Sequence, residues 1–348
     1  MQMLQTRLQD LSHQEASLDV HSEQSLSLDS DGTQRVDVRR NTAKPNSVAL
    51  SLPDTPASNT WVTQPPLLLR LIERAFAALR DTNCISLDRD LIGLTLHGDH
   101  ELALLSPDSM SAKDGALNCE RKTFFQSAAP WLRSRCSSSY PLTSTTEIGK
   151  IKHPLRPPEP AGLVYERFDP TLGMTVSFRA IDRERDLGTF HNWMNDGRVA
   201  FFWELAQSES ALAEYLDNLK HDPHAFGLIG CFDGDPFGYF EIYWAKEDRL
   251  GSYYDADDFD RGWHGLVGNR RHLGHAKTLA WLRAVTHYLF IDDIRTRKVV
   301  GEPKASHTKL LRYADAVAYY KVKEFDFPHK RSALMHCDRE TFFETVQL

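Results

Sequence analysis

The feature that most constrains the fold of this chain is a basic, glycine-bearing turn between a predicted strand and a long predicted helix. Residues 263–267 predict the strand, and residues 274–290, with apolar side chains at helical spacing, predict the helix. The turn gathers five cationic or potentially cationic side chains: Arg270, Arg271, His272, His275 and Lys277. Backbone N–H groups at a helix N-terminus favour a bound anion such as a diphosphate. A capped helix beside a solvated basic loop remains the alternative.

Predicted strands and helices alternate along the rest of the C-terminal half. The strands are 176–180, 226–231, 237–244, 262–267, 298–302, 319–325 and 332–337, and the helices are 186–195, 208–220, 274–290 and 308–317. This order predicts an α/β fold with one mixed sheet and helices on both of its faces.

The N-terminal half gives weaker signals. Residues 1–47 are polar and poor in aromatics, which predicts a disordered tail, with a docked helix over 3–11 as the alternative. A helical pattern follows Pro65 and Pro66, and a hairpin is expected around His97 and His100. We therefore predict four parts: a disordered polar tail (1–47), an α/β accessory domain (48–150), a Pro-rich linker (151–165) and a larger C-terminal domain (166–348).

Composition excludes several classes of protein. The 48 acidic and 41 basic residues leave a net charge of −7, which argues against nucleic acid or a membrane surface as partner. No apolar run is long enough to span a bilayer. The five cysteines are scattered without a CxxC pair and the histidines are dispersed, so we expect no metal site and a cytoplasmic location.

The spacing Arg271-x-x-Gly274-x-Ala276 resembles the signature of the Gcn5-related N-acetyltransferase (GNAT) superfamily, where it holds the diphosphate of acetyl-CoA. Longer blocks resemble one branch, the siderophore acyltransferases, which include aerobactin-type hydroxylysine acetyltransferases, mycobactin lysine acyltransferases and fungal hydroxyornithine transacylases. The blocks are residues 190–199, 202–203, 236–244, 246–251, 260–268, 299–303 and 327–335. The resemblance covers most of residues 166–343 and implies a catalytic GNAT domain there, with a degenerate copy of the fold in the N-terminal domain.

The resemblance implies acyl transfer from an acyl-CoA, by default acetyl-CoA, to the N-hydroxylated side-chain amine of ornithine, lysine or a related diamine. The product is a hydroxamate arm of a siderophore. An amine-hydroxylating flavin monooxygenase and a siderophore synthetase are the expected functional partners. An N-hydroxyamine is less basic than an alkyl amine, so the demand on a general base is modest.

The same resemblance implies roles for individual residues. His264 is the expected base or orienting group, with a hydrogen-bonded core histidine as the alternative, and Tyr313, with Ser306, is expected near the departing thiolate. The residues expected to bind the donor are Leu266, Val267, Arg271, Gly274, His275, Ala276, Lys277 and His307. The residues expected to bind the acceptor are Trp203, Glu241, Tyr243, Trp244, Asp260, Arg261 and Lys330. For the aromatic residues the alternative is ordinary core packing, and for Asp260 and Arg261 it is a structural pair. A backbone N–H near Leu266 or Val267 is expected to meet the oxyanion.

One position departs from the family pattern. Bacterial members have an aspartate, proposed as base, directly after the Glu-Pro pair, where this chain has Lys304. Fungal members have an aspartate where this chain has Ser306. Two rival hypotheses therefore stay open: an acetyltransferase of an unrelated amine such as an aminoglycoside, and a non-catalytic CoA-binding or scaffold protein.

Overall fold

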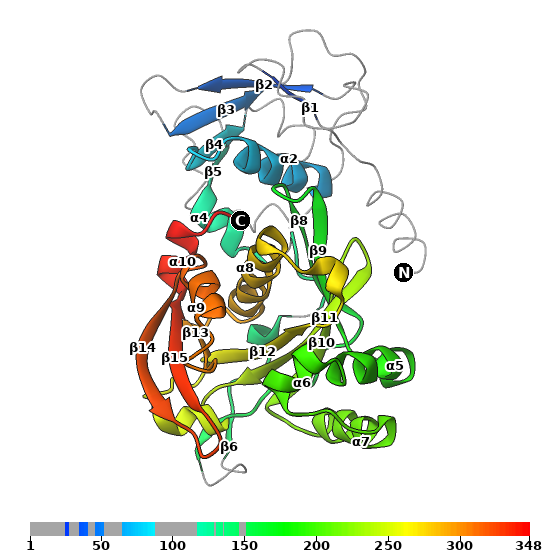
Figure 1. Cartoon of the computed structure of the whole chain (residues 1–348). Helices are drawn as coiled ribbons and strands as arrows, with labels where there is room; N and C mark the ends of the chain where they lie inside the picture. Colours follow the sequence, from blue (N-terminus) through cyan, green and yellow to red (C-terminus); the bar gives the residue numbers. More distant parts are fainter. Residues whose placement is uncertain are drawn as a thin grey trace. The chain divides into compact units, whose positions relative to one another are not determined.

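The computed structural model describes residues 25–27, 35–40, 46–51, 65–87, 117–128, 130–134, 136–145 and 151–348. The chain divides into two compact units, residues 1–130 and 131–348 (Figure 1). The expected helix over 3–11 and the hairpin around His97 and His100 lie outside the described residues.

The first unit contains a five-stranded sheet in the order β1-β2-β3-β4-β5, in which only the β3–β4 pair is parallel. Its elements are β1 (Ser25–Ser27), β2 (Arg35–Arg40), β3 (Ser47–Ser51), α2 (Pro65–Ala78), β4 (Cys84–Leu87), β5 (Leu117–Glu120) and α4 (Arg121–Gln126). The helix expected after Pro65 is α2. The buried rings of Phe76, Phe124 and Phe125 form part of the core, with centroids 5.3 to 6.0 Å apart.

Strands β1 and β2 correct our expectation that residues 1–47 form a disordered tail, because the described part of that segment is paired into the sheet. The sequence of β2, Arg-Val-Asp-Val-Arg-Arg, alternates β-branched and charged residues, as a half-buried strand does. The polar average over 47 residues conceals this short alternation. Val38, in the middle of it, is buried.

The second unit is built on an eight-stranded sheet in the order β14-β15-β13-β12-β11-β10-β9-β8, in which only β12 and β13 run parallel. The strands are β8 (Leu163–Asp169), β9 (Met174–Ala180), β10 (Ala225–Phe232), β11 (Asp235–Trp244), β12 (Arg261–Val267), β13 (Lys298–Gly301), β14 (Tyr319–Asp326) and β15 (Arg331–Asp338). The strands predicted in the C-terminal half are confirmed. Strand β8 was not predicted.

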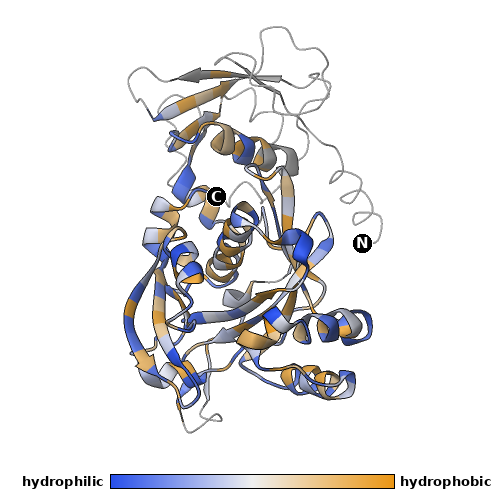
Figure 2. Cartoon of the chain, viewed as in Figure 1, coloured by the Kyte–Doolittle hydropathy of each residue, from blue (hydrophilic) through white to orange (hydrophobic). Residues whose placement is uncertain are grey.

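Helices cover both faces of this sheet, as expected. The helices are α5 (Arg183–Met194), α6 (Gly197–Trp203), α7 (Glu209–Lys220), α8 (His275–Asp292), α9 (Thr308–Asp315) and α10 (Arg339–Thr345). Phe190 of α5 and Leu212 of α7 pack with Tyr239 of β11 on one face. On the other face Trp281 of α8 contacts Phe240 of β11, and Figure 2 shows hydrophobic colours along most of α8. None of the helices within the described ranges is long and apolar enough to cross a membrane.

The second unit begins earlier than our predicted boundary near residues 150–160. Trp131 is 1% exposed, and its ring lies 4.9 Å from that of His287. Within the predicted linker, Arg156 is buried and forms two hydrogen bonds of 2.5 and 2.6 Å with the carboxylate of Glu247. The prolines of residues 151–165 correctly predicted extended backbone. They could not show whether this segment is a free linker or, as in the structure, is fixed by a buried ion pair.

Strand β12 and the Tyr243 side chain of β11 approach each other so closely at Gly262 that only glycine fits there. A Cβ atom added at Gly262 of β12 would lie 2.2 Å from the ring of Tyr243 on β11. We therefore expect Gly262→Ala to destabilise the fold by about 1 to 3 kcal/mol, because the ring must move within a packed interior. Gly188→Ala is the matched control: Gly188 lies in α5 with open space around it, and the change should stabilise by about 0.5 to 1 kcal/mol. Urea unfolding measures both, and equal effects of the two changes would contradict the packing argument.

Candidate active site

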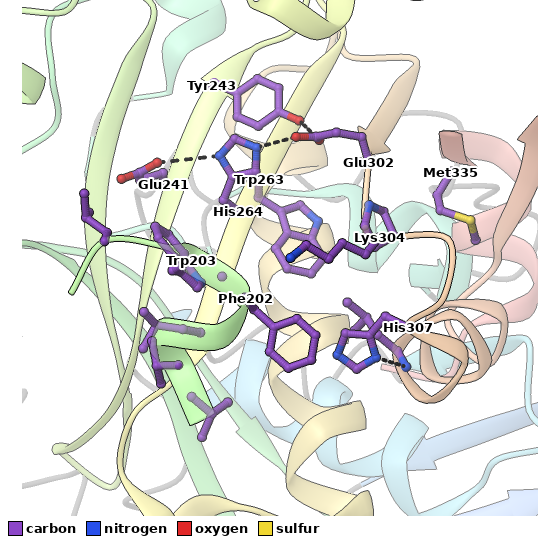
Figure 3. A pocket seen from close by; sticks show the side chains of 18 of the residues that line it. Phe202, Trp203, Glu241, Tyr243, Trp263, His264, Glu302, Lys304, His307 and Met335 are labelled. Atoms are coloured by element: carbon purple, nitrogen blue, oxygen red, sulfur yellow. Dashed lines mark hydrogen bonds and ion pairs between the residues drawn. The ribbon is translucent and has the colours of Figure 1, made fainter. Parts of the chain in front are cut away.

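The main cavity of the second unit opens where β12 and β13 separate. The two strands pair only at Arg261–Val299 and Gly262–Val300, so the later residues of β12 have no strand neighbour on that side. A cavity of about 1120 Å³ fills this space (Figure 3). Its walls come from the far end of β12, from β11, from α6 to α9 and from the loop after β13.

A chain of charged groups crosses the cavity wall from β11 to β13. Glu241 and His264 are direct partners across β11 and β12, and His264 Nδ1 lies 3.5 Å from Glu241 Oε2. His264 Nε2 lies 2.8 Å from Glu302 Oε1, just after β13. Both ring nitrogens of His264 therefore face a carboxylate, as Figure 3 shows. Within the described part of the chain no group of three or more His, Cys, Asp or Glu side chains is arranged so that it could hold a metal ion.

Tyrosines fix the two carboxylates. The hydroxyls of Tyr215 and Tyr239 both donate to Glu241 Oε1, the latter at 3.0 Å. The hydroxyl of Tyr243 donates to Glu302 Oε2, also at 3.0 Å. These bonds hold the carboxylates in one orientation, so the position of the imidazole between them is fixed as well.

This arrangement favours the charged form of His264. Burial of the ring opposes the charge, but the carboxylates of Glu302 and Glu241 outweigh it and raise the pKa of His264 to about 10. In return the imidazolium holds the pKa of Glu302 far below its usual range, although burial alone would raise it. Because the folded-state pKa of His264 lies above the ordinary value of 6.5, its contribution to stability is complete below about pH 6.5 and is lost as the pH rises through 10.

The basic turn differs in part from its prediction. Gly274, with φ of 140°, precedes α8 and provides no side-chain cap, and it lines the cavity. Arg271 instead bonds Asp235 at 3.0 Å, and Lys277 lies 2.9 Å from His272 Nδ1. Arg271 and Lys277 do not line the cavity. The helix N-terminus is thus open toward the cavity, whereas these two cations are held by neighbouring side chains.

Across the cavity, α6 and the residue that follows it contact the loop after β13 through an ion pair and a stacked pair of rings. Lys304 Nζ lies 3.0 Å from Glu204 Oε1, and the ring of Phe202 stacks on that of His307 with centroids 4.6 Å apart. All four residues line the cavity, and Figure 3 shows Phe202 and His307 facing each other. The lysine at the position of the family's aspartate is therefore one half of an ion pair across the cavity.

The structure brings together half of the predicted site. The predicted residues that line the cavity are His264, Tyr313, Leu266, Val267, Gly274, His307, Trp203, Glu241, Tyr243 and Lys330. The predicted residues that do not line it are Ser306, Arg271, His275, Ala276, Lys277, Trp244, Asp260 and Arg261.

For three of the predicted acceptor residues the physical reason is burial. Arg261 is fully buried, donates to Asp292 at 2.8 Å and lies 4.1 Å from the centre of the Trp244 ring. Asp260 is fully buried as well and accepts hydrogen bonds from Tyr254 and from the backbone of Asp257. Burial therefore favours the structural alternative over a substrate role for Trp244, Asp260 and Arg261.

The charged residues of the cavity wall that were not predicted include Glu302, Arg198 and Arg249. Glu302 was quoted only as part of a block, although a glutamate that ends a predicted strand beside the histidine strand could have been singled out. Arg198 lies on α6, a helix we did not predict. Arg249 lies 3.4 Å from Glu302 Oε1, a contact between residues 53 positions apart. No local sequence pattern signals that last contact.

The sequence of the chain is similar to those of known proteins. The family profile described as "Acetyltransferase (GNAT) domain" matches residues 182–327. A Schizosaccharomyces pombe protein provisionally named lysine N-acyltransferase is 41% identical over 241 residues, 69% of this chain and 71% of that protein. The N(6)-hydroxylysine O-acetyltransferase of Escherichia coli is 46% identical over 57% of this chain and 63% of its own length. A hydroxyornithine transacylase of Ajellomyces capsulatus is 43% identical over 60% of this chain and 48% of its own length. The chain thus spans between about half and seven tenths of these three relatives.

The protonation state of His264 can be tested directly. In protein labelled at histidine, NMR should show His264 as an imidazolium at pH 8, titrating near pH 10. Glu302→Gln removes the nearer carboxylate and should move the pKa toward its ordinary value. Glu204→Gln, which removes an exposed carboxylate paired with Lys304, is the control and should leave the titration unchanged. A wild-type midpoint near 6.5 would contradict the assignment.

Proposed function

The chain belongs to the GNAT acetyltransferases, and on that premise we propose that it transfers an acyl group from acyl-CoA to the N-hydroxylated side-chain amine of lysine, ornithine or a related diamine. The product is a hydroxamate of the kind used in siderophores. The observation that carries the proposal is the Glu241–His264–Glu302 chain in the wall of the cavity that opens between β12 and β13. The E. coli and A. capsulatus relatives support the choice of acceptor by their names.

The proposed reaction is direct attack. The neutral nitrogen of the N-hydroxyamine attacks the thioester carbon, a C–N bond forms and the C–S bond breaks. The proton lost by nitrogen passes to the carboxylate of Glu241, and the phenol of Tyr313 protonates the CoA thiolate. We assign His264 the orienting role rather than that of base, because an imidazolium has no lone pair left to accept a proton.

The donor is proposed to be acetyl-CoA, bound with its diphosphate at the open N-terminus of α8. The reaction as proposed needs no metal ion. It requires an earlier oxidation of the amine, for which an amine-hydroxylating flavin monooxygenase is the expected source, and a siderophore synthetase would use the product. A cytoplasmic location is part of the proposal, and the scattered cysteines without a CxxC pair are compatible with it.

Acceptor choice is measured by thiol release from acetyl-CoA. N6-hydroxylysine, N5-hydroxyornithine and N-hydroxycadaverine form the test panel, with lysine and kanamycin as comparisons. We expect thiol release with at least one hydroxylated amine and a kcat/KM at least about 100-fold lower with lysine, whose ammonium must first lose a proton. A preference for kanamycin would favour the aminoglycoside hypothesis, and no release with any acceptor would favour the scaffold hypothesis.

The orienting role of His264 is tested with His264→Ala and His264→Gln. We expect His264→Ala to lower kcat by about 100- to 1000-fold, the range for loss of a preorganised electrostatic group. His264→Gln keeps a hydrogen-bond donor between the carboxylates and should retain more activity. His329→Gln, at a nearby histidine of the cavity wall outside the charged chain, is the matched comparison. Near-normal turnover of His264→Ala would contradict the role.

A further inference from the structure

Arg198 lies at the start of α6, in a helix turn fixed by its own cap. The carboxylate of Asp196 accepts a hydrogen bond of 2.9 Å from the backbone N–H of Arg198. The side chain extends to β12, where Nη2 donates to the carbonyl of Val267 at 2.6 Å. Arg198 and Val267 both line the cavity.

That carbonyl belongs to the open edge of β12. The N–H of Gly268 donates to Phe237 O at 2.9 Å, toward β11. The C=O and N–H of one trans peptide point in opposite directions, so the Val267 carbonyl points away from β11. The pairing of β12 with β13 has ended at Gly262, five residues earlier. The guanidinium of Arg198 therefore lies along the free edge, immediately before the turn that leads to α8.

Three other cavity cations form ion pairs with carboxylates, whereas the Arg198 guanidinium is under the electrostatic influence of Asp196, the cap of its helix, without a direct ion pair among the described residues. Arg249 and Lys330 lie 3.4 and 3.7 Å from Glu302, and Lys304 lies 3.0 Å from Glu204. Arg198 forms no ion pair with a carboxylate among the described residues, and its acceptor is a neutral carbonyl. Its Nε is buried and has no hydrogen-bond partner there. Arg198 lines the cavity, and a guanidinium in a cavity wall is suited to an anionic ligand, above all to phosphate oxygens.

The cationic side chains of the turn between β12 and α8 are bound to neighbouring groups, so they do not already fill the role of binding an anionic ligand. Arg271 is 75% exposed and bonds Asp235, and Lys277 contacts His272 and the backbone of Arg271. Arg270 bonds Asp196, the cap of α6. The sequence signature predicts Arg271 as the anion-binding residue. The arginine beside the open edge of β12 is instead Arg198, from a helix about 70 residues earlier.

We propose that Arg198 binds the diphosphate of the acyl-CoA donor, and so fixes the donor along the open edge of β12. The inference rests on the proposed function, because it takes acyl-CoA as the donor. It adds a binding residue from α6 to the backbone N–H groups at the start of α8. Arg198 also makes α6 part of the donor site, on the same helix that carries Phe202 and Trp203.

Isothermal titration calorimetry separates the pantetheine arm of the donor from its 3′-phospho-ADP part, which contains the diphosphate. CoA and pantetheine, which lacks the diphosphate, are titrated into wild type, Arg198→Gln, Arg271→Gln and Arg331→Gln. We expect Arg198→Gln to weaken CoA binding by about 10- to 100-fold, as for loss of a charge-assisted hydrogen bond, and to leave pantetheine binding within about twofold. Arg271→Gln should weaken CoA binding less. Arg331, exposed on β15 and paired with Asp326 and Glu324, is the matched control.

The outcomes are distinguishable. Unchanged CoA affinity in Arg198→Gln overturns the inference, and so does an equal loss of CoA and pantetheine affinity, which would mean that Arg198 only supports β12. Failure of the wild type to bind CoA contradicts the proposed function itself. If Arg198→Gln does not fold, Arg198→Lys replaces it. A point charge without the two-pronged geometry should still weaken CoA binding severalfold and spare pantetheine.

Discussion

The charge pair of His264 and Glu302 is the interaction on which the rest of the site depends. A carboxylate that is almost fully buried, as Glu302 is, is costly unless a cation compensates it. The imidazolium 2.8 Å away provides that charge. The second carboxylate, Glu241, shares the same cation from the other side. His264 and Glu302 therefore stabilise each other's charged form, and Glu241 adds to the field that keeps the imidazole protonated.

Strand order makes this arrangement possible. Glu241, His264 and Glu302 come from three adjacent strands, β11, β12 and the end of β13. Gly262 leaves room for the Tyr243 ring, whose hydroxyl holds Glu302. Just beyond Gly262, β12 and β13 separate. At Gly262, therefore, the pairing of β12 with β13 ends and the ring of Tyr243 finds space. The cavity beside His264 begins directly after this position.

Local sequence patterns predicted most of the fold of the second unit, and the family resemblance supplied the site residues, of which ten line the cavity. Alternation and helical spacing identified the strands and helices of the second unit, and the glycine turn identified the N-terminus of α8. The missed features depend on tertiary contacts: Glu302 acquires its role from His264, and Arg198 from the edge of β12. Burial explains the opposite error, because Asp260 and Arg261 look like ligands in sequence but lie inside the sheet. The end of a predicted strand was the one local signal for Glu302, whereas the contact of Arg198 with β12 has no local signal in the sequence.

The most direct measurement is a crystal structure with a non-hydrolysable acyl-CoA analogue. The account predicts that the analogue lies along the free edge of β12. Its acyl carbonyl should lie within about 4 Å of a polar atom of the β12 wall, slightly more than the length of a hydrogen bond. Its diphosphate should lie between Arg198 and the start of α8. An analogue bound outside the space between β12 and β13, with His264 remote from the acyl group, would contradict it.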